Sequence, residues 1–329
     1  MRMLKEVGGL FAALITGALA GGVLAQGTAD DYPNRPVTIT IPFDAGSSHD
    51  TLLRPYVQSI LESTGKQFVL VFRPGAGTTI GMAYAAKAPP DGYTILSVSP
   101  AISITPSVYP DLPYDPVKDL APITLLSKQA FLLVVHPSAS YKTVSEYIAH
   151  ARTHPGELNW GTSGAGSATH LPGEFLHFLT KTRVTYIHYK TGSQRLVDLL
   201  AGRLQVSMAS FSNAMPHIKI GKMRAIGVTT NKRVPDWADM PTIEEQGVPG
   251  YDFSSWLGIL APGRTPAAII NKLNAYFVNA NKDPNVKKFE IDGNILVGST
   301  PEQLRQLVVA EMERWRRLIK DTGMKMDAQ

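Results

Sequence analysis

The sequence contains no cysteine among its 329 residues. This absence excludes disulfide bonds, thiolate metal sites, cysteine nucleophiles and the lipid-modified cysteine of a bacterial lipoprotein. A chain of this length does not need disulfides, because it can bury a sizeable hydrophobic core without them. The length indicates two domains or one large α/β domain.

The sequence also lacks a basic run. Its 32 lysines and arginines against 27 aspartates and glutamates give a formal net charge of +5, and these charges are scattered. Such a balance does not indicate a nucleic-acid partner, although it is compatible with an anionic ligand. There is no HExxH motif and no paired-carboxylate signature, so we expect no metal site, no cofactor and no catalytic residues.

The N-terminal residues have the pattern of an export signal. Arg2 and Lys5 lie just before a stretch that carries no charge and whose apolar part is short and rich in small residues. We expect residues 1–25 to be a secretory signal peptide, cleaved after Ala25 or alternatively after Ala20. An uncleaved membrane anchor is the competing interpretation, although the segment is short for a span. No other apolar run is long enough to cross a membrane.

Three glycine-rich turns, each placed between a strand-like run and a helix-like segment, are the main candidates for a site. They span residues 43–50, 73–81 and 161–170. Glycine allows backbone N–H groups to approach a ligand, and a helix N-terminus adds unpaired donors and a partial positive charge. Turns of this kind are also common for purely geometric reasons. Three of similar composition in one chain favour a small-anion site.

Strand-like and helix-like segments alternate along the chain, which predicts an α/β fold with mostly parallel sheet. Strands are expected at 37–43, 68–72 and 131–136, for example, and a capped helix begins at Thr300 with Pro301 at its first position. In such folds ligands bind at the carboxyl ends of strands, where the glycine turns lie. A cleft between two α/β lobes would bring the early and middle turns face to face.

An ordered set of short motifs makes the sequence more specific. It extends from Tyr32 to about Gly323, and its main members are Pro42-Phe43, Arg73-Pro74-Gly75-Ala76-Gly77, Pro90-Asp91-Gly92-Tyr93-Thr94, Leu112-Pro113-Tyr114-Asp115-Pro116, His170-Leu171, Pro216-His217-Ile218-Lys219 and Gly298-Ser299-Thr300-Pro301-Glu302. With this set the chain resembles the Bug (TctC-like) family of periplasmic solute-binding proteins of tripartite tricarboxylate transporters.

The resemblance implies a two-lobed, type II Venus-flytrap fold with a ligand cleft between the lobes and two crossing strands. Residues 26–130 and 252–329 would form the first lobe, and residues 131–251 the second. It also implies a periplasmic, non-enzymatic protein, expected to be a monomer, that captures a small carboxylate and delivers it to membrane permease subunits. A protein that reports its ligand to a sensor kinase is an alternative, and a secreted hydrolase is a remote one, because 161–165 narrowly misses a nucleophile-elbow pattern.

In the resembled family, backbone N–H groups, hydroxyls and ordered water hold the ligand's carboxylate. Carried over by position, the expected contacts come from both lobes and include one position after a later strand. They are Phe43, Asp44, Ala45, Gly46, Ser47, Ser48, Gly77, Thr78, Thr79, Ser163, Gly166, Ser167, Ala168, Thr169 and Ala209.

Three positions depart from the family's usual pattern. Asp44 replaces a proline, and it would repel an anion or select an amine if it faced the ligand; otherwise it is a solvent-facing turn residue. Ala209 lies where an acidic or amide residue is common, which points away from amino-acid ligands. His49 is expected to be a helix-start residue and not a metal ligand. An inward-facing Asp44 would favour a ligand with an amine, whereas Ala209 points away from amino-acid ligands. The sequence therefore does not identify the solute.

Overall fold

The computed structural model of the chain describes residues 31–109, 111–164, 167–189, 192–291 and 293–323. The expected signal peptide and Gly166 lie outside the described residues. Residues 33–329 form a unit separate from residues 1–32, and every helix and strand named below belongs to it. Among the described residues, no helix combines the length and the apolar character needed to cross a membrane.

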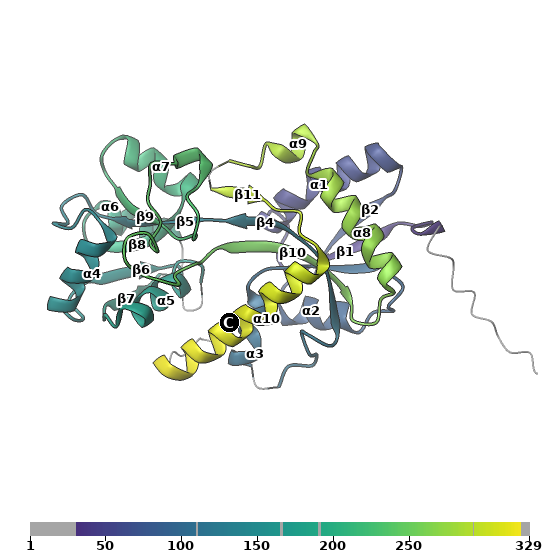
Figure 1. Ribbon diagram of the computed structural model, residues 1–329, viewed down its shortest axis with the longest axis horizontal. Helices are drawn as coiled ribbons and strands as arrows, with labels where there is room; N and C mark the ends of the chain where they lie inside the picture. Colours follow the sequence, from purple (N-terminus) through teal and green to yellow (C-terminus); the bar gives the residue numbers. More distant parts are fainter. Residues whose placement is uncertain (1–30, 110, 165–166, 190–191, 292, 324–329) are drawn as a thin grey trace, which may run out of the picture. The chain divides into compact units, whose positions relative to one another are not determined.

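The first of two sheets has the strand order β11–β4–β10–β3–β1–β2. Its strands are β1 Val37–Ile41, β2 Phe68–Phe72, β3 Thr94–Val98, β4 Leu120–Gln129, β10 Ser255–Pro262 and β11 Asn294–Leu296. The helices between or after these strands are α1 Ser48–Thr64, α2 Thr79–Ala86, α3 Ala101–Val108, α8 Ala267–Ala280, α9 Pro284–Lys287 and α10 Pro301–Thr322 (Figure 1). A 3-10 turn, η2, occupies Ala76–Thr78.

The second sheet has the order β7–β6–β8–β5–β9. Its strands are β5 Phe131–Val135, β6 Asn159–Thr162, β7 Thr185–His188, β8 Val206–Ser210 and β9 Arg224–Val228. Its helices are α4 Val144–Thr153, α5 Leu171–Thr180, α6 Gly192–Leu200 and α7 Phe211–Lys219, with a 3-10 turn, η3, at Pro235–Trp237. All five residues of β5 are buried, as expected for an apolar strand with neighbours on both edges and helices on its faces.

Two chain segments pass from one sheet to the other. β4 continues into β5 with only Ala130 between them. The second segment returns from the second sheet, where the Phe253 N–H donates a 2.9 Å hydrogen bond to the Thr229 carbonyl, and enters β10. β4 and β10 lie side by side as an antiparallel pair (Figure 1). These are the expected crossing strands, and the fold is that of a two-lobed periplasmic binding protein.

The expectation of mostly parallel sheet is wrong. β1 is parallel to β2 and β3, and β6 is parallel to β7 and β8. However, β10 is antiparallel to β3 and β4, and β5 is antiparallel to β8 and β9. The reason is connectivity: β5 follows β4 without a crossover helix, and β10 enters the first sheet from the opposite direction. Alternation of helix and strand does not reveal either feature.

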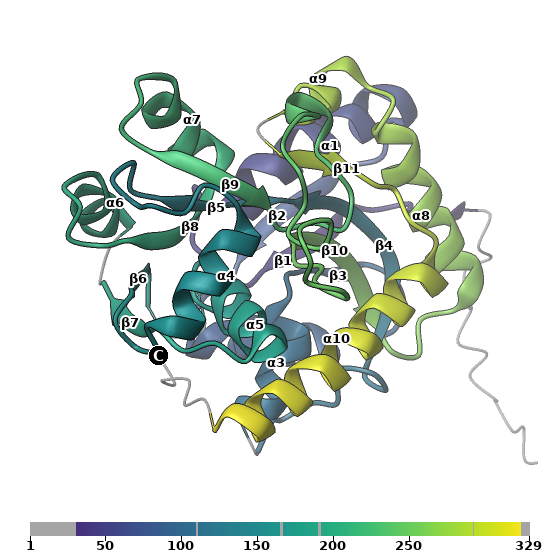
Figure 2. The same ribbon diagram turned by 60° about the vertical axis from the view of Figure 1, so that its left-hand side comes forward.

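The long C-terminal helix α10 stabilises the arrangement by packing into two cores. It begins with the expected capping box, in which the Gln303 N–H donates to Thr300 Oγ1 and the Thr300 N–H donates to Gln303 Oε1. Leu304 belongs to a hydrophobic cluster with residues of the first sheet. Trp315, three turns further on, belongs to a cluster with residues of the second. Figure 2 shows α10 crossing beside α3.

A buried carboxyl joins α10 to the crossing strand β10. Glu311 is only 6% exposed, and its Oε2 accepts a 3.0 Å hydrogen bond from Trp256 Nε1. Burial raises the pKa of Glu311 to about 7, against the opposing influence of the Trp256 hydrogen bond and the positive charges of Arg314 and Lys128. The nearby Asp252 raises it further.

This group should make stability fall as pH rises. Between the unfolded pKa near 4.5 and the folded pKa near 7, the folded state binds the proton that the unfolded state has lost, so stability decreases across this window and then levels off. The Glu311→Gln variant has no carboxyl to titrate at this position, so it does not show this decrease in stability with rising pH. Its stability relative to the unmodified protein should therefore grow between pH 4.5 and pH 8 by on the order of 3 kcal/mol.

The measurement is thermal and urea unfolding at several pH values. Glu302→Gln, which removes an exposed carboxylate from the same helix, is the matched control and should not reproduce the gain. A stability difference between Glu311→Gln and the unmodified protein that is independent of pH would contradict the assignment of a raised pKa.

Candidate functional site

A cavity of about 390 Å³ lies where the turns after β1 and β3 meet the 3-10 turn η2, the start of α5 and the start of β10. Its volume is within the range of small-molecule binding sites. Five expected site residues line it: Phe43, Ser48, Gly77, Thr78 and Ala168. The structure therefore brings parts of all three glycine-rich turns to one cavity.

The first turn is held in shape by Asp50, the third residue of α1. Its Oδ2 accepts a 2.8 Å hydrogen bond from the Gly46 N–H, and its Oδ1 lies 2.8 Å from Arg54 Nε. Burial alone raises the pKa of Asp50, but the hydrogen bonds from Gly46 and Arg54 and the charge of Arg54 hold it below its usual value. Asp50 is therefore an anion that fixes the backbone around the start of α1.

The start of α1 offers donors to the cavity. Ser47 is the N-cap, and its hydroxyl accepts from the Asp50 N–H at 3.4 Å. Helix geometry leaves the N–H groups of Ser48 and His49, the first two helical residues, without a helical partner. Both residues line the cavity. The N-terminus of this 17-residue helix lies at the cavity, and the partial positive charge of a helix N-terminus favours a bound anion.

His49 forms part of the cavity wall as an uncharged group. Its ring packs against Phe43 at 4.3 Å between centroids, and its Nδ1 lies 2.5 Å from Ser97 Oγ in a hydrogen bond. Burial lowers the pKa of His49 to about 3. The imidazole is therefore neutral at physiological pH and supplies no countercharge. The sequence placed it correctly at the helix start.

The second turn has an unusual backbone. Ala76, Gly77 and Thr78 have φ values of 46°, 60° and 80°, all in the left-handed region. This conformation costs a non-glycine residue on the order of 1–3 kcal/mol and often marks functional sites. A Cβ on Gly77 would lie 2.8 Å from the hydroxyl of Tyr109, so a side chain there would require the Tyr109 ring to shift.

The third turn uses its polar groups internally. Thr169 Oγ1 accepts a 2.8 Å hydrogen bond from the Ser163 N–H and lies 3.0 Å from Ser167 Oγ. Thr169 itself is buried. Of the expected contacts in this turn, Ala168 lines the cavity, whereas Ser163, Ser167 and Thr169 hold the loop together.

The other expected residues lie away from the cavity wall. Asp44 and Ala45 are exposed. The hydroxyl of Thr79 donates to the Ala76 carbonyl at 2.7 Å. Ala209 is 1% exposed within a hydrophobic cluster of the second sheet. Neither of the two ligand-selecting changes considered from the sequence, at Asp44 and Ala209, is therefore at the cavity.

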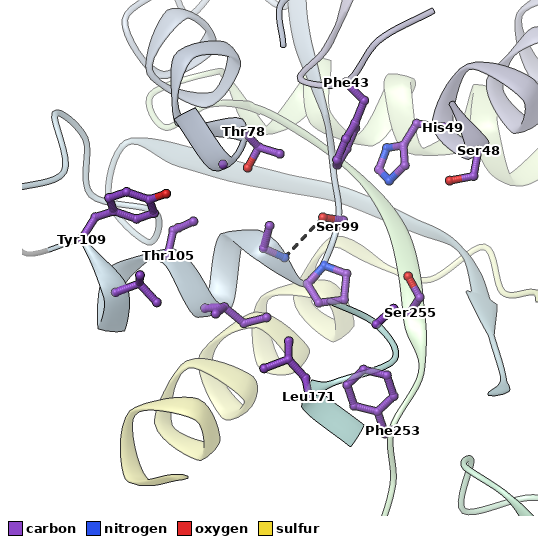
Figure 3. A pocket seen from close by; sticks show the side chains of 16 residues that line it. Phe43, Ser48, His49, Thr78, Ser99, Thr105, Tyr109, Leu171, Phe253 and Ser255 are labelled. Carbon is purple, nitrogen blue, oxygen red and sulfur yellow. Dashed lines mark hydrogen bonds between the residues drawn. The ribbon is translucent and has the colours of Figure 1, made fainter. Parts of the chain in front are cut away.

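Much of the cavity wall comes from residues that the sequence analysis did not name as ligand contacts. The largest contribution is the β3–α3 connection together with α3, and the second is the strand that returns into β10. These residues are Ser99, Pro100, Ala101, Ile104, Thr105, Val108, Tyr109, Leu171, Phe253 and Ser255 (Figure 3). The Ser99-Pro100 pair is a helix-start signal, and the Ala101 N–H donates to Ser99 Oγ at 3.3 Å.

A second cavity of about 320 Å³ lies on the other side of the α1 start. It shares Ser48, His49 and Ser255 with the first, and Gly46 lines it as well. Among the described residues, no group of three or more His, Asp or Glu side chains is placed to hold a metal ion.

Ser163, in the segment that narrowly misses a nucleophile-elbow pattern, and the helix start at His170 are both held by internal hydrogen bonds. His170 Nε2 is 3.1 Å from Glu174 Oε1, and the His170 ring packs edge-on against Tyr186 and His188. The Ser163 N–H is bonded to Thr169. These contacts describe a packed loop and helix start.

Comparison with known proteins gives a consistent result. The family model described as the tripartite tricarboxylate transporter family receptor matches residues 53–324. Protein BugT of Bordetella pertussis is 31% identical over 329 residues, covering 99% of each chain. The solved structure of R. palustris Rpa4515 with adipate is 34% identical with a TM-score of 0.72, covering 90% of this chain and 100% of that one. MatC from Rhodopseudomonas palustris with bound malate is 29% identical with a TM-score of 0.69, covering 88% and 100%.

The left-handed backbone at η2 leads to a stability prediction. Ala76→Gly should stabilise the protein by up to about 1 kcal/mol, because relief of left-handed strain exceeds the extra entropy of glycine in the unfolded chain. Ala83→Gly, inside α2, is the matched control and should destabilise by about 1 kcal/mol. Urea unfolding of both variants checks this. Equal destabilisation by the two changes would show that η2 does not hold strain at Ala76.

Proposed function

The chain belongs to the tripartite tricarboxylate transporter receptor family, and we propose that it is a periplasmic solute-binding protein that captures a small carboxylate for a transporter of this type. The family and fold are those of periplasmic binding proteins, which act by binding and not by catalysis. We further propose that the first 25 residues direct export and are removed, that the protein is a monomer, and that it delivers its solute to membrane permease subunits.

The observation that carries the proposal is a cavity rich in neutral donors at a helix N-terminus. The N–H groups of Ser48 and His49, and the hydroxyls of Ser48, Thr78 and Ser255, belong to residues of the cavity wall. Backbone donors and a helix dipole stabilise a carboxylate without placing a full positive charge beside it. Two similar proteins have been solved with carboxylates, adipate in one and malate in the other.

The cavity draws its wall from elements of both sheets, which supports a binding protein that closes on its ligand. Ser48 and Thr78 follow strands of the first sheet, while Ala168 and Leu171 follow β6 of the second. A ligand that touches both groups stabilises the conformation in which they lie close together. A transporter receptor of this kind signals its loaded state through that conformation.

The function is tested by ligand-induced stabilisation of the mature protein, from Gln26 onward, with a panel of small carboxylates. A ligand at 100 times its Kd raises stability by about 2.7 kcal/mol and so raises Tm. We expect at least one carboxylate to do so. Ala168→Phe should abolish the shift, because its ring would occupy the cavity, while Ala149→Phe, at an exposed position on α4, should retain it.

Two outcomes would contradict the proposal. One is the absence of any shift from a protein that native mass spectrometry shows to be free of co-purified ligand. The other is an undiminished shift in folded Ala168→Phe, which would place the binding site elsewhere in the molecule.

A further inference from the structure

We propose that His49 contacts the solute, with its Nε2–H held as a neutral hydrogen-bond donor to an oxygen atom of the bound carboxylate. This inference rests on the proposed solute-binding function and names a side chain that recognises the solute. It is carried by the position of the imidazole between two cavities and by its hydrogen bond to Ser97.

His49 lies where the two cavities meet. It is one of three described residues that line both, together with Ser48 and Ser255, and only 7% of its surface is exposed. Figure 3 shows the imidazole between Phe43 and Ser48, with Ser99 and Ser255 across from it. The small accessible part of His49 therefore faces space that a solute can occupy.

Two contacts fix the orientation of the imidazole. Its ring packs against Phe43 at 4.3 Å between centroids, with 45° between the ring planes, and its Nδ1 lies 2.5 Å from Ser97 Oγ. Ser97, on β3, is fully buried. Because Nδ1 is engaged, Nε2 is the ring nitrogen left for a ligand. Nε2 bonds to none of the described residues and is not sealed inside the protein.

The hydrogen bond to Ser97 favours one tautomer of His49. A neutral imidazole carries one N–H, on either Nδ1 or Nε2. Ser97 Oγ has no other hydrogen-bond partner among the described residues, so a bond donated by Nδ1 would leave the buried Ser97 hydroxyl hydrogen unpaired. In the favoured arrangement the Ser97 hydroxyl donates to Nδ1, and the imidazole proton lies on Nε2.

A neutral donor at Nε2 suits a carboxylate that is partly removed from water. Burial lowers the pKa of His49 to about 3, so the imidazole is uncharged at neutral pH. An N–H facing a carboxylate oxygen replaces a hydrogen bond that this oxygen loses with water. Hydrogen bonds to charged groups contribute more than those between neutral groups, so loss of this donor should weaken binding measurably.

Isothermal titration calorimetry of the ligand-free mature protein at pH 7.5 tests this role. Acetate, adipate, malate and benzoate are titrated, and the acid with the lowest Kd serves as the probe. His49→Phe keeps an aromatic ring but has no N–H, so it should weaken binding of the probe about ten- to hundredfold. His49→Gln restores a neutral N–H donor, and its affinity should lie within about fivefold of that of the unmodified protein.

A second histidine–serine pair provides the matched control. His136 Nδ1 lies 2.7 Å from Ser138 Oγ, and His136 lines neither cavity. His136→Phe therefore removes an imidazole with the same kind of partner and should leave the Kd of the probe unchanged. Thermal unfolding checks that each variant is folded before it is titrated.

Nuclear magnetic resonance tests the donor in the unmodified protein. The signals of His49, one of eight histidines, are assigned by their absence from spectra of His49→Gln. Long-range proton–nitrogen correlations in the ligand-free protein should show the Nε2–H tautomer, and the probe should shift the Nε2 signal. Ser97→Ala should produce a mixture of the two tautomers, because the group that selects between them is gone.

The outcomes separate this inference from the proposed function. If none of the four acids binds to ligand-free protein, the proposed function fails and the role of His49 fails with it. If an acid binds, three results would each overturn the role of His49 alone: full affinity in folded His49→Phe, an equal loss in His49→Phe and His49→Gln, or a proton on Nδ1 in the ligand-free protein.

Discussion

The antiparallel pairing of β4 with β10 is the constraint on which the rest of the structure depends. Both are interior strands of the first sheet, and the segments that continue from them enter the second. Their position is fixed by burial: eight of ten residues in β4 and seven of eight in β10 are buried. The position of the cavity depends on this pairing, because Phe253 and Ser255 of its wall lie where the returning segment enters β10. Trp256, the next residue, ties the same strand to α10 through Glu311.

Around this frame, the proposed site would hold an anion by backbone N–H groups and a helix dipole. Two charged groups near the first turn, Asp50 and Arg54, are bonded to one another and hold the start of α1. A preformed set of N–H donors requires little reorganisation when a carboxylate arrives, which helps affinity. A lysine or arginine in the wall would attract anions more strongly but would discriminate less between them.

The sequence predicted the parts of this molecule that follow from local chemistry. Thr300, Pro301 and Gln303 predict the start of α10, and the glycine-rich turns lie at strand ends and contribute to one cavity. It did not predict α3, because Pro106 and β-branched residues within Ala101–Val108 read as non-helical, whereas packing against α10 makes the helix stable. It placed Ser163, Ser167 and Thr169 of the third turn among the ligand contacts, whereas in the structure their polar groups bond to one another. Whether Thr169 faces a ligand or its own loop depends on tertiary contacts.

The proposed site has a backbone part and a side-chain part. The backbone part comprises the start of α1 and the left-handed turn through Gly77, and side-chain changes should alter it little. The opposite wall is made of side chains such as Ile104, Val108 and Leu171, each of which sets the volume and polarity met by the rest of the solute. On the proposed function, replacing these residues should change the solute preference without disturbing the crossing strands. Specificity would then depend on these side chains more than on the fold.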